Sequence, residues 1–236
     1  ERDQWFIATK FGHRFTGLFE RDQIWDADGV ARQLEDSLRA LRTDYVDLLQ
    51  FHSGGNDVFD NAELWQRLAD LKREGKVRHI GVSIWANTND YQTAKAPEVG
   101  AEAIQVVYNR LDRAPEEQVL PLCEQHDLGV LARVPLASGY LSGKYKPGAS
   151  FDETDVRSRH DREKVEERLR EVERIGREEV PEGVPMAEWA LAWCLKHPAV
   201  TSVIPGCKNV EQVKSNARAA EISDLVRDDH PQAVKE

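Results

Sequence analysis

Short runs rich in valine and isoleucine alternate along this chain with segments whose apolar residues recur every three or four positions. Six such runs are expected to be strands: residues 5–11, 45–52, 79–85, 103–109, 129–137 and 201–207. Their apolar residues do not alternate cleanly with polar ones, which is typical of strands covered on both faces. The pattern therefore predicts a parallel sheet with a crossover helix after each strand.

The number of these units constrains the α/β fold class further. No glycine-rich first turn is present, which disfavours an open doubly wound sheet. A closed (β/α)8 TIM barrel needs eight units and typically about 250 residues, whereas this chain of 236 residues holds six units. We therefore expect an incomplete (β/α)8 barrel, lacking roughly its first two units.

We expect one domain over residues 1–236 that supplies strands 3 to 8 of such a barrel. Residues 138–180 would form an excursion made of a loop and an extra helix. The chain starts at Glu1 and runs directly into a strand-like segment, which favours an N-terminally truncated fragment.

Composition excludes several classes of function. Acidic residues outnumber basic ones, 42 to 32, so a nucleic-acid partner is not expected. No apolar run approaches the roughly 20 residues that span a bilayer, and no secretory signal opens the chain. Three cysteines without C-x-x-C spacing fit a reducing cytoplasm. The histidines show no metal-binding spacing, so no metal site is expected.

Polar residues stand where several of the expected strands end. They are Lys10, His52, Ser83, Gln105 with Asn109, Ser138 and the segment from Gly206. Active sites of (β/α)8 barrels lie at the carboxyl ends of the strands, so these residues are candidates for a common site. Each taken alone has an ordinary structural explanation, such as a lysine reaching solvent or a hydrogen-bonded, half-buried histidine. A lysine and a histidine on adjacent strand ends are harder to explain in that way.

Six short motifs resemble those of the aldo-keto reductases, in that family's order and at the expected strand ends. They are residues 7–10 (IATK), 47–52 (DLLQFH), 81–83 (GVS), 105–109 (QVVYN), 135–145 (PLASGYLSGKY) and 203–206 (VIPG). The resemblance covers essentially the whole chain. It implies hydride transfer between NADPH and the carbonyl carbon of a small aldehyde or ketone.

The family uses four catalytic residues, namely Asp, Tyr, Lys and His, and the resemblance implies that Lys10 and His52 are the last two. A buried ammonium beside a phenol lowers the phenol's pKa and makes it a usable general acid at neutral pH. The Asp and Tyr belong to a segment before the first expected strand, and no tyrosine of this chain lies in a matching motif. We therefore expect this chain to bind cofactor weakly at best and to be inactive.

The resemblance also implies contacts to an NADP(H) cofactor. Ser83 and Gln105 match positions that hold the nicotinamide carboxamide, and Arg133 falls where many members stack an aromatic ring on the nicotinamide. Residues 135–144 resemble the loop over the pyrophosphate, and Lys208 at a helix start suits the 2′-phosphate. The full implied set is Ser83, Gln105, Arg133, Pro135, Leu136, Ser138, Gly139, Leu141, Lys144, Ile204, Gly206, Lys208, Gln212 and Asn216.

Three further residues are candidates for the substrate pocket: Trp25, Trp85 and Arg110. Packing against the barrel core explains the two tryptophans about equally well. The leading hypothesis is an NADP-dependent aldo-keto reductase acting on a small carbonyl substrate. A non-catalytic, nicotinamide-nucleotide-sensing regulatory subunit on the same fold, as in the potassium-channel β subunits, is the alternative. A barrel lyase or hydrolase with His52 as its base is a third possibility, and it predicts no affinity for nicotinamide nucleotides.

Overall fold

The computed structural model describes residues 1–227, which fall into two compact units. Unit 1 holds Glu1–Val106 and Glu117–Val130. Unit 2 holds Val107–Glu116 and the described residues from Leu131 onward. The strands β6 (Ala103–Val107) and β7 (Gly129–Arg133) each contribute residues to both units.

Parallel strands form the centre of unit 1. The strands β1 (Ala8–Phe11), β4 (Val46–His52), β5 (Val77–Ser83) and β6 are neighbours in this order, and each pairing is parallel. Neighbours in the sheet are thus successive in the chain apart from a hairpin, as in a barrel and unlike a doubly wound sheet. The side chains of β4 are buried along the strand as far as Phe51, which confirms that both faces are covered.

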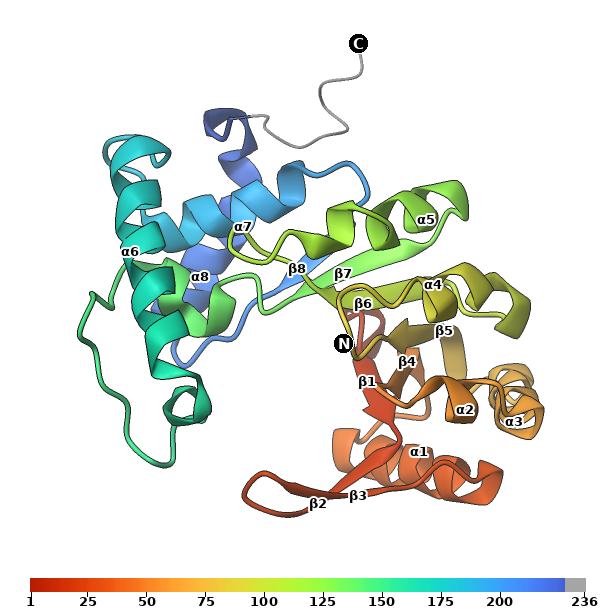
Figure 1. Ribbon diagram of the computed structural model, residues 1–236. Coiled ribbons are helices and arrows are strands. Elements are labelled where there is room, and N and C mark those ends of the chain that lie inside the picture. Colours follow the sequence, from red (N-terminus) through yellow and green to blue (C-terminus); the bar gives the residue numbers. More distant parts are fainter. Residues whose placement is uncertain (228–236) are drawn as a thin grey trace. The chain divides into compact units, whose positions relative to one another are not determined.

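The helices of unit 1 present an apolar stripe to the sheet. In α1 (Ala27–Leu41) the buried side chains Val30, Leu34 and Leu38 are spaced four residues apart, which places them on one face. The Asp26 carboxylate caps this helix by accepting a hydrogen bond from the Gly29 N–H at 2.7 Å. The other helices of the unit are α2 (Asn56–Phe59), α3 (Ala62–Arg73), α4 (Asp90–Lys95) and α5 (Val119–Gln125) (Figure 1).

A hairpin between β1 and α1 was not predicted from the sequence. Its strands, β2 (His13–Gly17) and β3 (Glu20–Gln23), pair in antiparallel fashion (Figure 1). All their residues except His13 are exposed, so no buried face imposes an apolar alternation on the sequence. The hairpin is therefore invisible to the periodicity that identifies the other strands.

Unit 2 contains the end of β7 and the short parallel strand β8 (Ser202–Ile204), with Arg133 opposite Ile204. Its helices are α6 (Arg162–Glu178), α7 (Met186–Lys196) and α8 (Val210–Arg218). The buried residues of α6 recur every three or four positions along one face: Val165, Leu169, Val172 and Ile175. The helix α7 is buried more deeply, because every residue from Glu188 to Cys194 lies in the core.

Short 3₁₀ turns connect these elements. Within residues 1–227 they are Arg2–Gln4, Pro97–Val99, Ala114–Glu116, Ala137–Ser142, Val156–Arg159, Ala219–Glu221 and Ser223–Leu225. The predicted strand 129–137 ends at Arg133, because Val134 adopts a left-handed backbone with φ of 55°. The structure confirms an α/β fold of parallel strands followed by helices.

Candidate active site

The carboxyl ends of the unit 1 strands bring polar side chains to one face of the sheet. In the parallel register Lys10 lies opposite Gln50, His52 lies opposite Ser83, and Ser83 lies opposite Gln105. Side chains two positions apart on a strand point to the same side, as do those in register on a neighbouring strand. The structure therefore places Lys10, His52, Ser83 and Gln105 on a common face, as the sequence predicted for these four.

The centre of this face is a buried amide pair beside an unpartnered hydroxyl. Gln50 and Gln105 are buried, and the Gln50 Nε2 donates to the Gln105 Oε1 at 3.1 Å. Within the described residues, the buried Ser83 Oγ and Gln50 Oε1 have no hydrogen-bond partner. A buried polar atom left unpaired costs about 1–3 kcal/mol. The arrangement therefore fits a ligand that carries an amide, such as the carboxamide of a nicotinamide nucleotide.

Gln50 was missed as a functional candidate in the sequence, although it lies in the DLLQFH motif. The signal available in the sequence was a glutamine inside a strand of buried residues, two positions before His52. That position gives Gln50 the same orientation as His52. Its hydrogen bond fixes which way the Gln105 amide points, so Gln50 orients a predicted cofactor residue.

A second imidazole lies beside His52. The ring centroids of His13 and His52 are 4.9 Å apart, and the Trp25 ring packs edge-on against His13 at 5.4 Å. Burial, followed by the charge of Arg21, holds the pKa of His13 below its ordinary value. The neighbour of His52 is therefore harder to protonate than an ordinary imidazole, so it adds little positive charge beside His52.

The two tryptophans proposed for the substrate pocket differ in environment. Trp25 is half-buried and packs against Phe51 at 4.9 Å and Phe11 at 6.3 Å, both of which are core residues. Its position matches the packing explanation. Trp85 lies just beyond β5 and is 72% exposed, so it does not cap the core of unit 1.

The turn after β7 has an unusual backbone. Val134, Ala137 and Ser138 have φ values of 55°, 48° and 58°, and Gly139 follows at 90°. A left-handed β-branched residue such as Val134 costs of order 1–3 kcal/mol. Its carbonyl oxygen accepts hydrogen bonds from the Asn109 side chain and from the Ala137 N–H, which hold the turn in place. Strained turns of this kind are frequent where backbone approaches a ligand.

The glycine at position 139 is required by the turn itself. Its φ is left-handed, and a Cβ there would lie 3.4 Å from the Arg157 guanidinium. Arg157 pairs with Asp155 and stacks over the Tyr145 and Phe151 rings at 4.4 Å each. This arginine was not identified in the sequence. It holds the segment after residue 150 against the predicted pyrophosphate loop.

The other predicted residues of this loop differ in accessibility. Arg133 is half-buried, its Nε has no partner within the described residues, and burial lowers its pKa. Pro135 and Leu141 are buried. Leu136 is half-buried and Lys144 is exposed.

The start of α8 carries the residues predicted to bind the adenosine phosphate. Asn209 is its N-cap and accepts a hydrogen bond from the Gln212 N–H at 2.9 Å. The Gln212 Oε1 in turn accepts from the Lys208 N–H at 2.7 Å, so this side chain is used in capping. The Lys208 side chain is exposed. Of the remaining predicted residues, Ile204 and Gly206 are exposed and Asn216 is half-buried.

Arg110 does not lie open to a substrate. Its guanidinium donates to both carboxylate oxygens of Glu179, at 3.0 and 2.8 Å, and both side chains are 15% exposed. Planar bidentate pairs of this kind are strong and geometrically fixed. Arg110 therefore has a structural partner within unit 2, which is the simpler explanation for its presence.

No group of three or more His, Cys, Asp or Glu side chains within residues 1–227 is arranged to hold a metal ion. In the same part of the chain, no helix has the length and apolarity needed to cross a membrane.

A model of the Aldo/keto reductase family matches residues 1–235 of this sequence. The chain belongs to the aldo-keto reductase family. This result confirms the resemblance seen in the sequence motifs. The parallel strands and following helices of the structure agree with it.

Individual relatives agree with the family assignment. The chain is 34% identical over 227 residues to the uncharacterized oxidoreductase YqkF of Bacillus subtilis, covering 94% of this chain and 71% of that protein. It is 29% identical to the aldo-keto reductase yakc [NADP(+)] of Schizosaccharomyces pombe, covering 94% and 66%. The holo form of aldo-keto reductase AKR11C1 from Bacillus halodurans has a TM-score of 0.75 at 30% identity, covering 96% of this chain and 74% of that one.

Proposed function

We propose that this aldo-keto reductase is an NADP-dependent oxidoreductase that reduces an aldehyde or ketone by hydride transfer. The observation that supports it is the face shared by Lys10, His52, Ser83 and Gln105 in unit 1. This face combines a cation and an imidazole with buried amides and with the Ser83 hydroxyl, which lacks a hydrogen-bond partner among residues 1–227. Among the relatives, the yeast enzyme whose name specifies NADP(+) favours the same cofactor.

Some residues of unit 1 would hold the nicotinamide ring, and others would polarise the substrate carbonyl. Ser83, with Gln105 held by Gln50, would bind the nicotinamide carboxamide and fix which face of the ring meets the substrate. His52 would donate a hydrogen bond to the substrate carbonyl oxygen. The Lys10 ammonium would favour negative charge on that oxygen as the carbonyl is reduced. NADPH, when bound, supplies the hydride, and Trp85 is the better candidate for a substrate contact.

In unit 2, the strained turn after β7 and the start of α8 would hold the phosphates. The backbone around Ser138 and Gly139 would approach the pyrophosphate. Lys208 would pair with the 2′-phosphate, aided by the positive end of the α8 dipole. A single lysine at this place predicts a preference for NADPH over NADH, without excluding NADH.

Titration of the protein with NADPH tests the cofactor assignment. The chain contains six tryptophans, so we expect saturable quenching of their fluorescence. A lyase or hydrolase that uses His52 as a base would show no such response. Because only weak binding is expected of this chain, the titration extends to millimolar nucleotide, and absence of quenching by NADPH, NADP⁺ and NADH alike at that level would overturn the proposal.

Turnover separates the enzyme from the nucleotide-sensing alternative. No residue of this chain matches the Asp and Tyr of the family's catalytic set, so we expect NADPH binding with little aldehyde reduction. Joining a segment that carries an Asp and a Tyr for these positions to the start of this chain would supply both groups. We then expect aldehyde reduction that Lys10→Met abolishes. A fused protein that folds and binds NADPH but remains inactive would favour a sensor.

A Ser83→Ala substitution should weaken NADPH binding by about 3–10-fold, the usual worth of one neutral hydrogen bond. Its free energy of unfolding should stay constant or rise, because the buried Ser83 Oγ lacks a partner in the described residues. Ser37→Ala is the control, since the Ser37 hydroxyl donates to the Gln33 carbonyl oxygen of its own helix. Fluorescence titration and urea unfolding measure the two effects. A loss of stability without loss of affinity would contradict the assignment.

A further inference from the structure

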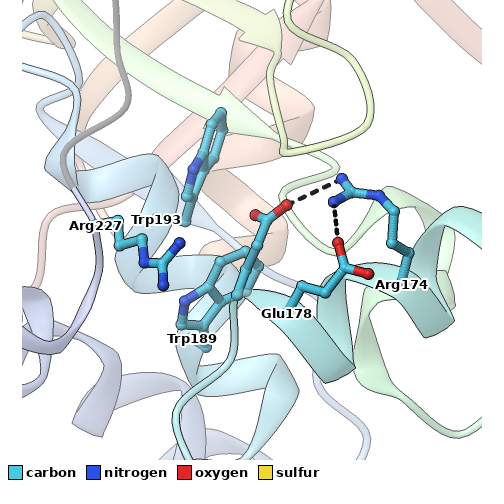
Figure 2. A pocket seen from close by; sticks show the side chains of 6 residues that line it. Arg174, Glu178, Trp189, Trp193 and Arg227 are labelled. Carbon is cyan, nitrogen blue, oxygen red and sulfur yellow. Dashed lines mark hydrogen bonds and ion pairs between the residues drawn. The ribbon is translucent and has the colours of Figure 1, made fainter.

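Unit 2 contains a cavity of about 220 Å³ that none of the predicted site residues lines. Its walls come from the end of α6, from α7 and from the residue that ends the described chain. Figure 2 shows two indole rings between an arginine on one side and an arginine–glutamate pair on the other. The lining residues are Arg174, Glu178, Glu179, Trp189, Trp193 and Arg227.

The two carboxylates of this cavity are already neutralised. Glu178 accepts hydrogen bonds from Arg177 at 2.7 Å and from Arg174 at 2.9 Å, and these bonds hold its pKa below the ordinary value. Glu179 accepts from Arg174 at 3.0 Å and from Arg110 in a bidentate pair. Because both acids have arginine partners, they offer little attraction to a cationic ligand.

The groups that remain are hydrogen-bond donors. Trp189 is only 2% exposed, and its Nε1 has no partner within the part of the chain that the structure describes. Arg227 lies on the same side of the cavity as Trp189 (Figure 2). It has no ion pair among residues 1–227. An unpaired buried N–H is costly, and an indole N–H can only donate. An acceptor carried by a ligand would satisfy both groups.

We propose that this cavity binds a small carboxylate that carries a flat apolar group. One carboxylate oxygen would accept from the Trp189 N–H and the other from the Arg227 guanidinium. The apolar group would rest against the indole rings of Trp189 and Trp193, which supply the flat walls. The site lies wholly in unit 2 and uses none of the residues proposed for cofactor or substrate, so it is a second ligand site beyond the oxidoreductase function.

Benzoate is a suitable probe, with benzyl alcohol as its neutral analogue and benzylammonium as its cationic one. The indole N–H resonances in ¹H–¹⁵N spectra report binding, with the Trp189 signal assigned from a Trp189→Phe variant. We expect benzoate to shift the Trp189 resonance saturably, and benzyl alcohol to bind at least tenfold more weakly. No NADPH is present, so the result does not depend on the proposed oxidoreductase function.

Two arginine variants complete the test. Arg227→Gln should weaken benzoate binding at least tenfold, because a charge-assisted hydrogen bond is lost. Arg170→Gln is the matched control, since Arg170 is exposed on α6 and pairs only with Glu166 among the described residues. Both side chains are exposed, so both variants should keep the fold, which their spectra verify. Equal binding of benzyl alcohol, a preference for benzylammonium, no shift at tens of millimolar benzoate, or an unchanged affinity in Arg227→Gln would each overturn the proposal.

Discussion

A Lys208→Ala variant should bind NADPH about 10–100-fold more weakly than the unmodified chain, while its affinity for NADH stays nearly constant. Hydrogen bonds to charged groups are worth about 1.5–3 kcal/mol, which corresponds to this range. Lys208 immediately precedes the N-cap of α8, and its side chain is exposed. The 2′-phosphate distinguishes the two nucleotides, so only NADPH should lose a contact.

The structure also explains why the lysine can be replaced without disturbing the helix start. The hydrogen bonds that cap α8 use the Asn209 side chain, the Gln212 side chain and the backbone N–H of Lys208, all of which alanine preserves. Lys214→Ala, an exposed change within α8, is the control for a general effect of charge. Fluorescence titration with both nucleotides measures the affinities. Equal losses for NADPH and NADH would remove Lys208 from the phosphate site.

An Asp47→Ala variant should lower the free energy of unfolding by about 3 kcal/mol at pH 7, near the lower end of the cost of breaking a buried ion pair. The Asp47 side chain is 3% exposed and accepts hydrogen bonds from the Ile7 N–H at 2.9 Å, from Arg2 at 2.7 Å and from Arg78 at 2.9 Å. It thereby fastens the start of the chain to β4. Both arginines are partly exposed, which limits the penalty of leaving them unpaired.

The effect of Asp47 should depend on pH in a defined direction. Burial would raise its pKa, but the Ile7 N–H bond, the Arg2 bond and the charges of Arg2 and Arg78 outweigh burial and lower it. A carboxyl with a depressed folded-state pKa stabilises the protein above its ordinary value, near 3.8, and this contribution is lost as pH falls towards the folded-state value. The difference in unfolding free energy between the unmodified chain and Asp47→Ala should therefore shrink below about pH 4.

Urea unfolding at several pH values measures this difference, with Asp44→Ala as the control because Asp44 is exposed. A difference that is constant between pH 7 and pH 3 would show that the stabilisation comes from packing and not from the charge.

The two faces of β4 explain why Asp47 has a structural role while Gln50 faces the candidate site. Asp47 shares its orientation with Leu49 and Phe51, while Gln50 shares that of His52.

The placement of Lys10, His52 and Ser83 on strand ends was predictable from the sequence, whereas their roles in a site stay predictions. His52 and Ser83 follow buried residues, Lys10 stands one residue before the end of β1, and parallel strands bring such ends to the same edge of a sheet. Alternation then places them on one face without any knowledge of the helices. The positions of α1 and α6 were predictable for a similar reason, because each buries an apolar stripe with helical spacing.

Pairings between distant polar residues were not predictable. The Gln50–Gln105 hydrogen bond joins residues 55 positions apart, and the Arg110–Glu179 pair joins residues 69 apart. No local sequence pattern predicts such partners, because each of these polar side chains, taken alone, could equally be exposed to solvent or contact a ligand. The hairpin β2–β3 was missed because its exposed residues carry no apolar period.

We propose that Lys10 and His52 meet one carbonyl oxygen beside a nicotinamide held by Ser83 and Gln105. A crystal structure of this chain with NADP⁺ tests it directly. We expect the nicotinamide carboxamide within hydrogen-bond distance of the Ser83 Oγ, with the ring on the same face of the sheet as Lys10 and His52. A nicotinamide bound elsewhere, or a Lys10 ammonium or His52 ring that points away from it, would contradict the account.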